Sequence, residues 1–312
     1  MKAVLHYRAG PNFRAMAEAL RGTLDVAIVE PGDADGMARE MADAEVLLHV
    51  LAPVTAEVMD LAPKLRLVQK IGVGIDAIDR AHAKARGVAV CNMPGTNTAA
   101  VTEMTLALML ACLRRIPVLH AGTAAGDIWP RAGEIGDGLG EIGGRTVGLV
   151  GYGAVAQRLA PVLRALGAEV IAHSRTARGD GVEFVGLDDL LARADIVSLH
   201  LPANAETQNL LDGRRLALMK PGAIFINTAR GSLVDEAALA NALSSGRLGA
   251  AGLDVFAAEP PPSANPLLGL PNVVLAPHLA WLTQETLRRS LEIVAENVRR
   301  LQAGEALLHR VA

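Results

Sequence analysis

Three side chains able to carry acid–base and anion-binding chemistry stand in separate short motifs of the second half of the chain. Arg230 lies in N-T-A-R-G, Glu259 in D-V-F-A-A-E-P and His278 in A-P-H. Each follows an apolar run that predicts a strand, and open α/β sheets place ligands beyond the carboxyl ends of their strands. Singly, each could be a surface arginine, a loop acid or a core histidine. Together they supply the anion clamp, the proton donor and its partner that reduction of a 2-oxo acid requires.

A glycine turn in the middle of the chain indicates where a dinucleotide would bind. Residues Thr146 to Gln157 read T-V-G-L-V-G-Y-G-A-V-A-Q, an apolar run followed by Gly151-x-Gly153 and then by helical spacing. A strand, tight turn and helix of this kind place a pyrophosphate at the positive helix N-terminus. The third glycine of the usual fingerprint is Ala156, which the pattern allows. A plain structural turn is the alternative, because a lone glycine motif is weak evidence.

The segment about twenty residues beyond the glycine turn predicts the type of nicotinamide cofactor. An acid at this point would bond the ribose hydroxyls and exclude a 2′-phosphate. This chain instead has Ser174, Arg175 and Thr176, with Arg178 beyond and no acid before Asp180. Arg175 could pair with a phosphate, and the two hydroxyls could donate to it. We therefore expect NADP(H) to be favoured and NAD(H) to remain possible, the alternative being a solvated turn that does not discriminate.

Alternating apolar strands and helical runs predict two α/β domains with parallel sheets. Strands are expected in the first half at Ala3–His6, Val26–Val29, Val46–His49, Leu67–Lys70 and Val88–Cys91. Those of the second half are Glu169–His173, Asp195–His200, Ala223–Thr228, Ala250–Val255 and Val273–Ala276. Because no glycine fingerprint follows the first strand, we expect the first half to bind substrate. The predicted architecture has two Rossmann-like or flavodoxin-like doubly wound domains. Residues 97–284 form the NAD(P) domain, inserted in a substrate domain of residues 1–96 and 285–312.

Composition limits the possible partners of the chain. Its 312 residues are 51% hydrophobic and 20% charged, with a formal net charge of −3, so no basic field for nucleic acid is expected. The two cysteines, Cys91 and Cys112, lie far apart in apolar surroundings and are expected to be buried thiols. No apolar run is long enough to span a bilayer. We expect a cytoplasmic protein without a metal, a nucleic-acid partner or a membrane partner.

The region between the two halves is expected to be a long helix followed by an arm. The run from Asn97 to about Ala121 has no polar stripe, which predicts a helix covered on all sides and part of a subunit interface. The glycine-rich stretch from Ala121 to Gly144 is expected to be extended, with Trp129 serving in packing. Earlier in the chain, Gly72 and Gly74 could form an anion-binding nest or a plain turn capped by Asp76.

The ordered motifs resemble those of the D-isomer-specific 2-hydroxyacid dehydrogenases over nearly the full chain. The shared segments are G-V-G-I-D-A-I-D at 72–79, G-Y-G-A-V-A-Q at 151–157, L-H-L-P at 199–202, N-T-A-R-G-S-L-V-D at 227–235, G-L-D-V-F at 252–256 and A-P-H at 276–278. The resemblance implies that Arg230 binds substrate, Glu259 is the acid partner and His278 is the proton donor. It also implies that Asp254 and Thr228 hold the nicotinamide carboxamide and that the backbone of Val73 and Gly74 holds the substrate carboxylate. The cofactor contacts implied in full are Gly151, Gly153, Ala154, Val155, Ser174, Arg175, Thr176, His200, Leu201, Pro202, Thr207, Thr228, Ala229, Asp254 and Ala280.

Departures from the family pattern fall close to the histidine. Ala280 and Trp281 stand where many members have serine or glycine, and Ala257 replaces a common acid. Trp281 could wall the substrate pocket or pack at an interface. The predicted function is NAD(P)H-dependent reduction of a small 2-oxo acid, glyoxylate or hydroxypyruvate, by a homodimer. D-lactate and 3-phosphoglycerate remain alternatives, the latter disfavoured because the chain ends after its last predicted helix. A dinucleotide-sensing, corepressor-like binding module is the alternative of another class, and phosphite or formate oxidation is a further one.

Overall fold

The computed structural model describes residues 1–176 and 181–312, which form two compact units. Met1–Asn97 and Trp281–Ala312 make up the first unit, and Thr98–Ala280 make up the second. The domain boundaries are predicted after residues 96 and 284, and the structure divides the chain after residues 97 and 280. Both units contain a parallel sheet flanked by helices, so the predicted fold class is confirmed.

The first unit has a five-stranded sheet with the order β2-β1-β3-β4-β5. This is the flavodoxin-like order of doubly wound sheets. Its strands are β1 (Lys2–His6), β2 (Asp25–Val29), β3 (Val46–His49), β4 (Leu67–Lys70) and β5 (Ala89–Cys91). Its helices are α1 (Pro11–Glu18), α2 (Ala34–Met41), α3 (Ala56–Asp60), α4 (Arg80–Ala85) and α12 (Gln284–Ala303).

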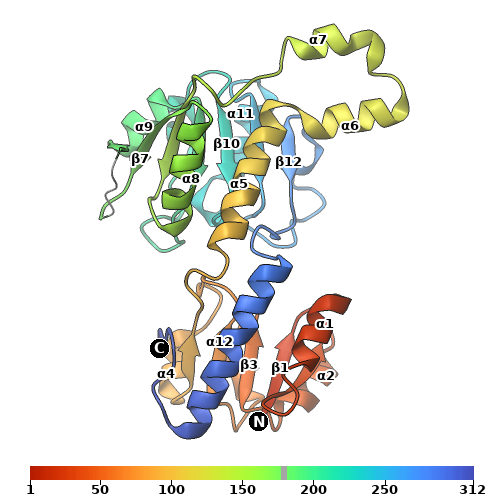
Figure 1. Ribbon diagram of the computed structural model, residues 1–312, viewed down its shortest axis with the longest axis vertical. Helices are drawn as coiled ribbons and strands as arrows, with labels where there is room; N and C mark the ends of the chain where they lie inside the picture. Colours follow the sequence, from red (N-terminus) through yellow and green to blue (C-terminus); the bar gives the residue numbers. More distant parts are fainter. Residues whose placement is uncertain (177–180) are drawn as a thin grey trace. The chain divides into compact units, whose positions relative to one another are not determined.

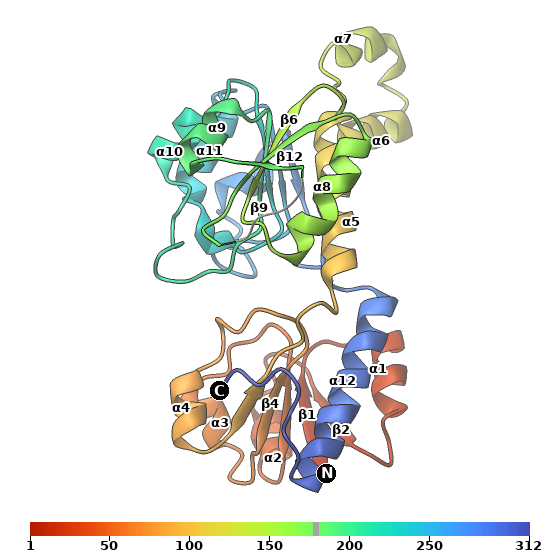
Figure 2. The same ribbon diagram turned by 60° about the vertical axis from the view of Figure 1, so that its left-hand side comes forward.

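Helices cover both faces of this sheet. Met37, Met41 and Met59, from α2 and α3, share one core with strand residues such as Leu47. On the other face α1 and α12 lie side by side (Figures 1 and 2). Helix α4 begins after Asp79, whose carboxylate accepts a hydrogen bond from the backbone N–H of His82. The predicted Asp76 cap is therefore wrong, because the turn after β4 runs three residues further before the helix starts.

The second unit has a seven-stranded parallel sheet with the order β12-β11-β10-β9-β6-β7-β8. Its strands are β6 (Thr146–Val150), β7 (Glu169–His173), β8 (Glu183–Phe184), β9 (Ile196–Leu199), β10 (Ile224–Asn227), β11 (Ala250–Leu253) and β12 (Val273–Leu275). The order reverses at β6, and ligands of doubly wound sheets bind at such a switch point. The short strand β8 was not predicted from the sequence.

Two hydrophobic cores flank this second sheet, between the strands and the helices drawn on either side of it in Figure 2. Helices α5 (Thr98–Leu113) and α8 (Ala154–Ala165) cover one face, with Met109 and Leu159 fully buried. Helices α9 (Leu187–Arg193), α10 (Gly213–Leu218) and α11 (Glu236–Ser244) cover the other. These cores hold the strands in register, so the loops at their carboxyl ends start from fixed positions.

The prediction for the region between α5 and β6 is wrong. Helix α5 ends at Leu113, and α6 (Ile116–Ala125) starts after Arg115, which adopts the left-handed conformation with φ of 49°. Pro117 lies in the first turn of α6, where its missing N–H costs no hydrogen bond. The stretch expected to be extended contains η1 (Trp129–Arg131) and α7 (Ala132–Gly136). Gly122 is tolerated in α6 because Ile128 packs where a Cβ would lie.

Helices α6 and α7 project from the body of the second unit (Figure 1). Helix α6 has no buried residue, Ile116 is 51% exposed and Trp129 is 73% exposed. Trp129 is therefore not packed within this unit, and the predicted packing role is not seen there. Among the described helices, no single one is long and apolar enough to cross a membrane. Helices α5 and α6, which are bent by 60° at the break between them, have the required length and composition only as a pair.

The two cysteine thiols are free and buried, as predicted. Cys91 lies in the last position of β5, and Cys112 lies near the end of α5. Burial raises the pKa of Cys91 to about 11 and that of Cys112 to about 12. Both are therefore thiols at neutral pH and poor nucleophiles.

Candidate active site

Arg230, Glu259 and His278 lie in loops that leave the carboxyl ends of β10, β11 and β12, three neighbouring strands. The structure brings the acid and the imidazole into direct contact, with 2.6 Å between His278 Nδ1 and Glu259 Oε2. Both side chains are partly exposed, at 19% for His278 and 31% for Glu259. Because Nδ1 faces the carboxylate, Nε2 is the nitrogen through which His278 would exchange a proton with a substrate.

Glu259 is held as a carboxylate. Burial disfavours its ionisation, but the hydrogen bond and charge of His278 act in the opposite direction, helped by the Phe256 N–H and the charge of Arg230. Together these groups hold the pKa of Glu259 below its usual range. The Phe256 N–H donates to Glu259 Oε1 over 3.0 Å, so each carboxylate oxygen has a partner. Glu259 is therefore an ionised acceptor held in a fixed orientation against Nδ1 of His278.

Asp254 fixes the loop that carries the histidine. Its carboxylate oxygens accept from the N–H groups of Leu279 and Ala280 at 2.8 and 2.9 Å, and its carbonyl oxygen accepts from the His278 N–H at 2.7 Å. His278 has a φ of 56°, a left-handed conformation that needs such support. Burial raises the pKa of Asp254, and the two backbone N–H groups oppose that rise. This positioning role was not anticipated beside the expected carboxamide contact.

Asn227 fixes the loop that carries Arg230, as Asp254 fixes the histidine loop. Its fully buried side chain donates from Nδ2 to the Arg230 carbonyl over 2.8 Å and accepts at Oδ1 from the Ala229 N–H over 3.0 Å. Arg230 Nη1 donates to the Ala229 carbonyl over 2.7 Å. The Oγ atoms of Thr228 and Thr105, a residue of α5, lie 2.8 Å apart and tie this loop to that helix. Asn227 was missed from the sequence, although it stands at the head of the N-T-A-R-G motif.

Gly231 permits the Arg230 loop and the Glu259 loop to approach. A Cβ at Gly231 would lie 1.9 Å from the Phe256 carbonyl carbon, so any larger residue would push the loops apart. Glu236, the first residue of α11, accepts from the Ala257 N–H at 2.6 Å and from Asn265 Nδ2 at 2.8 Å. The second loop is therefore braced from the helix that follows Arg230.

The glycine turn after β6 fits a dinucleotide pyrophosphate. Gly151 has a φ of 93°, and a Cβ there would lie 2.4 Å from the His200 carbonyl oxygen. Gly153 is the N-cap of α8, whose first residues are Ala154 and Val155. No side chain caps this helix, so its N-terminal N–H groups can bind an anion. Burial lowers the pKa of His200 to about 4. Its Nε2 has no hydrogen-bond partner among the described residues, which makes it an available neutral donor or acceptor beside the turn.

The other predicted cofactor residues lie in the loops on either side of β6. Ser174, Arg175 and Thr176 follow β7, and Leu201, Pro202 and Thr207 follow β9. Thr207 Oγ donates to the Pro202 carbonyl at 2.8 Å, which closes the second loop. Arg175 forms an ion pair with Glu206 of that second loop. Glu206 lies too far along the sequence from the glycine turn for the fingerprint to indicate it. Arg178 and Asp180 lie outside the described residues.

Three predicted substrate residues belong to the first unit. Val73 and Gly74 follow β4, with Val73 40% exposed and its carbonyl accepting from Asn92 Nδ2 at 3.0 Å. Gly72 has a φ of 135°, so the turn depends on a glycine there. Trp281 is 6% exposed, so its ring is packed rather than presented to solvent.

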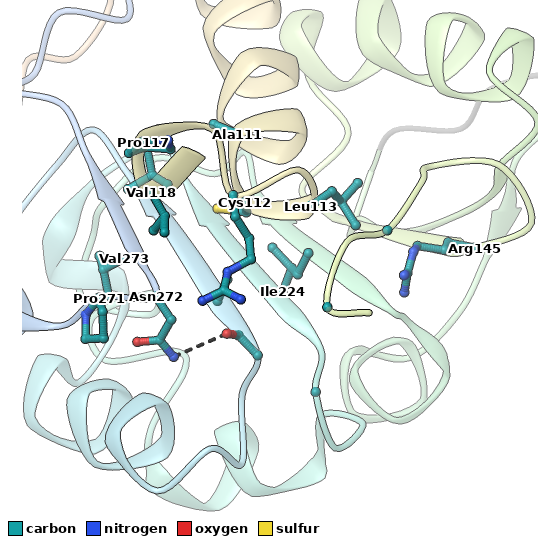
Figure 3. Close-up of a pocket in the computed structure, with 17 residues that line it drawn as sticks. Ala111, Cys112, Leu113, Pro117, Val118, Arg145, Ile224, Pro271, Asn272 and Val273 are labelled. Atoms are coloured by element: carbon teal, nitrogen blue, oxygen red, sulfur yellow. Dashed lines mark hydrogen bonds between the residues drawn. The ribbon is translucent and has the colours of Figure 1, made fainter. Parts of the chain in front are cut away.

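A pocket of about 380 Å³ in the second unit lies away from this chemistry (Figure 3). It is lined by Pro117, Val118 and Leu113 from the α5–α6 region and by Ile224 and Val273, the first residues of β10 and β12. It therefore sits at the amino ends of the strands, whereas Arg230, Glu259 and His278 follow their carboxyl ends. We assign no part of the candidate active site to it.

Known proteins match this sequence over most of its length. Residues 106–280 match the model of the D-isomer specific 2-hydroxyacid dehydrogenase NAD binding domain. The chain is 44% identical to the D-3-phosphoglycerate dehydrogenase of Mycobacterium bovis over 293 residues, 92% of this chain and 54% of that protein. It thus spans about half the length of that relative. It is 40% identical to the glyoxylate reductase of Korarchaeum cryptofilum over 270 residues, 84% of this chain and 81% of that protein.

A solved structure agrees over the whole chain. The NADPH-dependent glyoxylate/hydroxypyruvate reductase of Sinorhizobium meliloti, in complex with NADP and malonate, has a TM-score of 0.85 and 30% identity. The comparison covers 100% of this chain and 96% of that one. With a family model that covers more than half of the sequence, and a relative 40% identical of which the chain covers 81%, the chain belongs to the D-isomer-specific 2-hydroxyacid dehydrogenase family.

Proposed function

We propose that the chain reduces a small 2-oxo acid to the D-2-hydroxy acid with NAD(P)H. The observation that carries this proposal is the Glu259–His278 contact beside Arg230, in the unit that also holds the glycine turn. The reaction consumes one hydride and one proton, and the protein must supply the proton and hold the acid. A nicotinamide bound at the glycine turn would supply the hydride.

The roles of the side chains follow from their chemistry. Arg230 binds the substrate carboxylate and carbonyl oxygens with its planar fork and so orients the carbonyl carbon. As hydride reaches that carbon, negative charge grows on the carbonyl oxygen, and imidazolium His278 donates the Nε2 proton to it. Glu259 stabilises the imidazolium before the transfer. The predicted contact of the Val73 and Gly74 backbone with the substrate carboxylate remains part of the proposal.

Two cofactor forms and two substrate classes are considered within this proposal. The Ser174-Arg175-Thr176 segment favours NADP(H), and the structural relative from Sinorhizobium meliloti is described as NADPH-dependent. Glyoxylate and hydroxypyruvate are the proposed substrates, supported by the glyoxylate reductase relatives. The phosphorylated 3-carbon acid handled by 3-phosphoglycerate dehydrogenases is the second candidate, favoured by the 44% identity to that class.

A panel of steady-state rates tests the proposal. Glyoxylate, hydroxypyruvate, 3-phosphohydroxypyruvate and pyruvate are each offered with NADPH and with NADH, and loss of nicotinamide absorbance is followed. We expect the highest kcat/KM for glyoxylate or hydroxypyruvate with NADPH. A preference for the phosphorylated acid would assign the second candidate. Cofactor binding without turnover of any acid would contradict the enzyme and favour the binding module.

Asn227→Ala is expected to lower kcat/KM by roughly 10- to 100-fold, because small misplacement of an orienting group costs about that much. The change removes a fully buried side chain and leaves the Ala229 N–H and the Arg230 carbonyl, which are partly buried, without their partner. Steady-state kinetics and the free energy of unfolding are measured together. Asn241→Ala, on the exposed side of α11, is the control and should leave both unchanged. Unchanged kinetics in folded Asn227→Ala would exclude the positioning role.

We further propose that the chain forms a homodimer through the α6–α7 arm. The arm exposes Ile116 and Trp129 rather than burying them, and exposed apolar surface of this kind marks an interaction site. The 380 Å³ pocket of Figure 3, beneath the α5–α6 junction, offers further uncovered apolar lining beside the arm. A second copy is the partner that a two-fold assembly would place there.

Trp129→Glu is expected to convert the dimer to a monomer at micromolar concentration, raising the dimer dissociation constant at least about 30-fold, as loss of a buried interface aromatic does. Sedimentation velocity gives the masses. Leu218→Glu is the control, because it places the same charge at another exposed apolar side chain. Leu218 is the last residue of α10, away from the arm, and is 37% exposed. A wild-type chain that sediments as a monomer, or a mutant that stays dimeric, would contradict this interface.

A further inference from the structure

An ion pair lies across the end of β6, where the glycine turn begins. Arg175 follows β7 and Glu206 follows β9, and these two strands flank β6 on either side. Arg175 Nη1 donates to Glu206 Oε2. The pair therefore joins the two loops that border the predicted cofactor site. In dinucleotide-binding folds the ribose next to the adenine is recognised at this edge of the sheet.

The backbone that carries Glu206 is fixed by local hydrogen bonds. Asn204 Oδ1 accepts from the N–H groups of Glu206 and Thr207 at 2.9 and 3.1 Å, and Thr207 Oγ accepts from the Asn204 N–H at 2.9 Å. The turn is thus closed on both sides, although both charged side chains are exposed, at 73% for Arg175 and 69% for Glu206. The carboxylate is held within reach of the guanidinium without being buried.

Resting on the proposed function, we propose that Glu206 limits the preference for NADP(H) by competing for Arg175. A 2′-phosphate binds through Arg175, but it must first displace the Glu206 carboxylate and then remain near its negative charge. A 2′-hydroxyl carries no charge and can donate to the same carboxylate. The pair therefore raises the affinity for NADH relative to NADPH and gives a site that accepts both cofactors.

Glu206 thereby supplies the acid that the fingerprint lacks. The usual position for that acid is the end of β7, which this chain fills with Ser174, Arg175 and Thr176. Here the carboxylate comes from the opposite side of β6, on a separate loop. Arg175 alone would favour NADPH over NADH more strongly than Arg175 paired with Glu206 does.

Glu206→Gln tests this inference. The dissociation constants of NADPH and NADH are measured by nicotinamide fluorescence for the wild type, Glu206→Gln and Arg175→Gln, without substrate. We expect Glu206→Gln to tighten NADPH about fivefold, the upper range for an exposed charge pair, and to leave NADH equal or weaker. Raising the ionic strength should shrink the effect, since exposed charges are screened. Arg175→Gln should weaken NADPH at least about tenfold, since it removes a charged hydrogen bond.

The control and the contrary results separate this inference from the proposed function. Glu305→Gln removes another exposed carboxylate, paired with Arg299 at 2.6 Å in the first unit, and should change neither affinity. If Arg175→Gln weakens NADPH but Glu206→Gln changes neither cofactor, or both equally, the Glu206 role is overturned while the cofactor preference stands. If Arg175→Gln also leaves NADPH binding unchanged, the proposed NADP(H) preference itself fails. Turnover with glyoxylate, measured at saturating cofactor, reports independently on the dehydrogenase.

Discussion

His278→Ala is expected to lower kcat for 2-oxo acid reduction by roughly 100- to 10,000-fold, the range of positioned general acid catalysis. By the proposed mechanism, the variant should still bind cofactor through the glycine turn and substrate through Arg230, but no protein group would deliver the proton. KM should therefore change little. Pre-steady-state absorbance at the nicotinamide band separates the loss of the chemical step from slower product release. Substrate binding equal to wild type with wild-type kcat would remove His278 from the mechanism.

Glu259→Gln is the matched test of the partner in this proton transfer. The carboxamide can still accept from His278 Nδ1, but it cannot stabilise a positive ring. Because the pKa of Glu259 lies below its usual range, the wild-type carboxylate stays ionised from neutral to mildly acidic pH. The carboxylate charge stabilises the positive ring that donates the proton, whereas the neutral carboxamide does not. The limb on which reductive kcat declines with rising pH should move to lower pH in the variant. An unmoved limb would show that Glu259 only holds the ring in place.

The sequence predicts the two sheets well because their strands are buried on both faces. Val46–His49 and Leu67–Lys70 are buried at every position, and helices cover them in the structure as parallel sheets require. The glycine turn and the positions of Arg230 and His278 follow from the same logic. Strand ends fix where a loop starts, so a chemical group just beyond a strand end can be placed from the sequence.

What the sequence does not predict depends on contacts between segments that are distant in the chain. Glycine content suggested an extended arm, but Ile128 packs onto Gly122 and the segment is helical. Trp129 looked like a packing residue by type, yet it is exposed in the single chain. Such tertiary contacts override local propensity.

The same limit applies inside the candidate site. Asn227 and Asp254 are ordinary polar residues at strand ends, and only the folded loops show that they hold Arg230 and His278 in position. Glu206 stands 31 positions from Arg175 in the sequence, so no motif joins them. The chemistry-bearing groups were predictable from residue type, whereas the groups that position or compete with them required the fold.

Arg230→Ala is expected to raise KM for glyoxylate about 10-fold or more and to lower kcat as well. Truncating one partner of a charged, hydrogen-bonded pair costs about 2–5 kcal/mol, which corresponds to roughly 30- to 5,000-fold in kcat/KM. Both parameters should change because, in the proposed mechanism, the guanidinium binds the carboxylate in the ground state and orients the carbonyl for hydride and proton transfer. This distinguishes Arg230 from His278, whose loss should act on kcat alone. Steady-state kinetics over a wide range of glyoxylate concentration gives both parameters.

Arg230→Lys tests whether the fork or the charge matters. A lysine keeps the positive charge but cannot make two parallel hydrogen bonds, so most of the loss should remain. Arg214→Ala, which removes an exposed arginine paired with Asp188 at 2.9 Å, should leave both parameters unchanged. NADPH affinity should be the same in all three variants, since Arg230 lies on the substrate side of the proposed reaction. If lysine restores full activity, a point charge suffices and bidentate orientation of the substrate is wrong. If Arg230→Ala and His278→Ala lose kcat alone and to the same extent, the division between binding and proton transfer collapses.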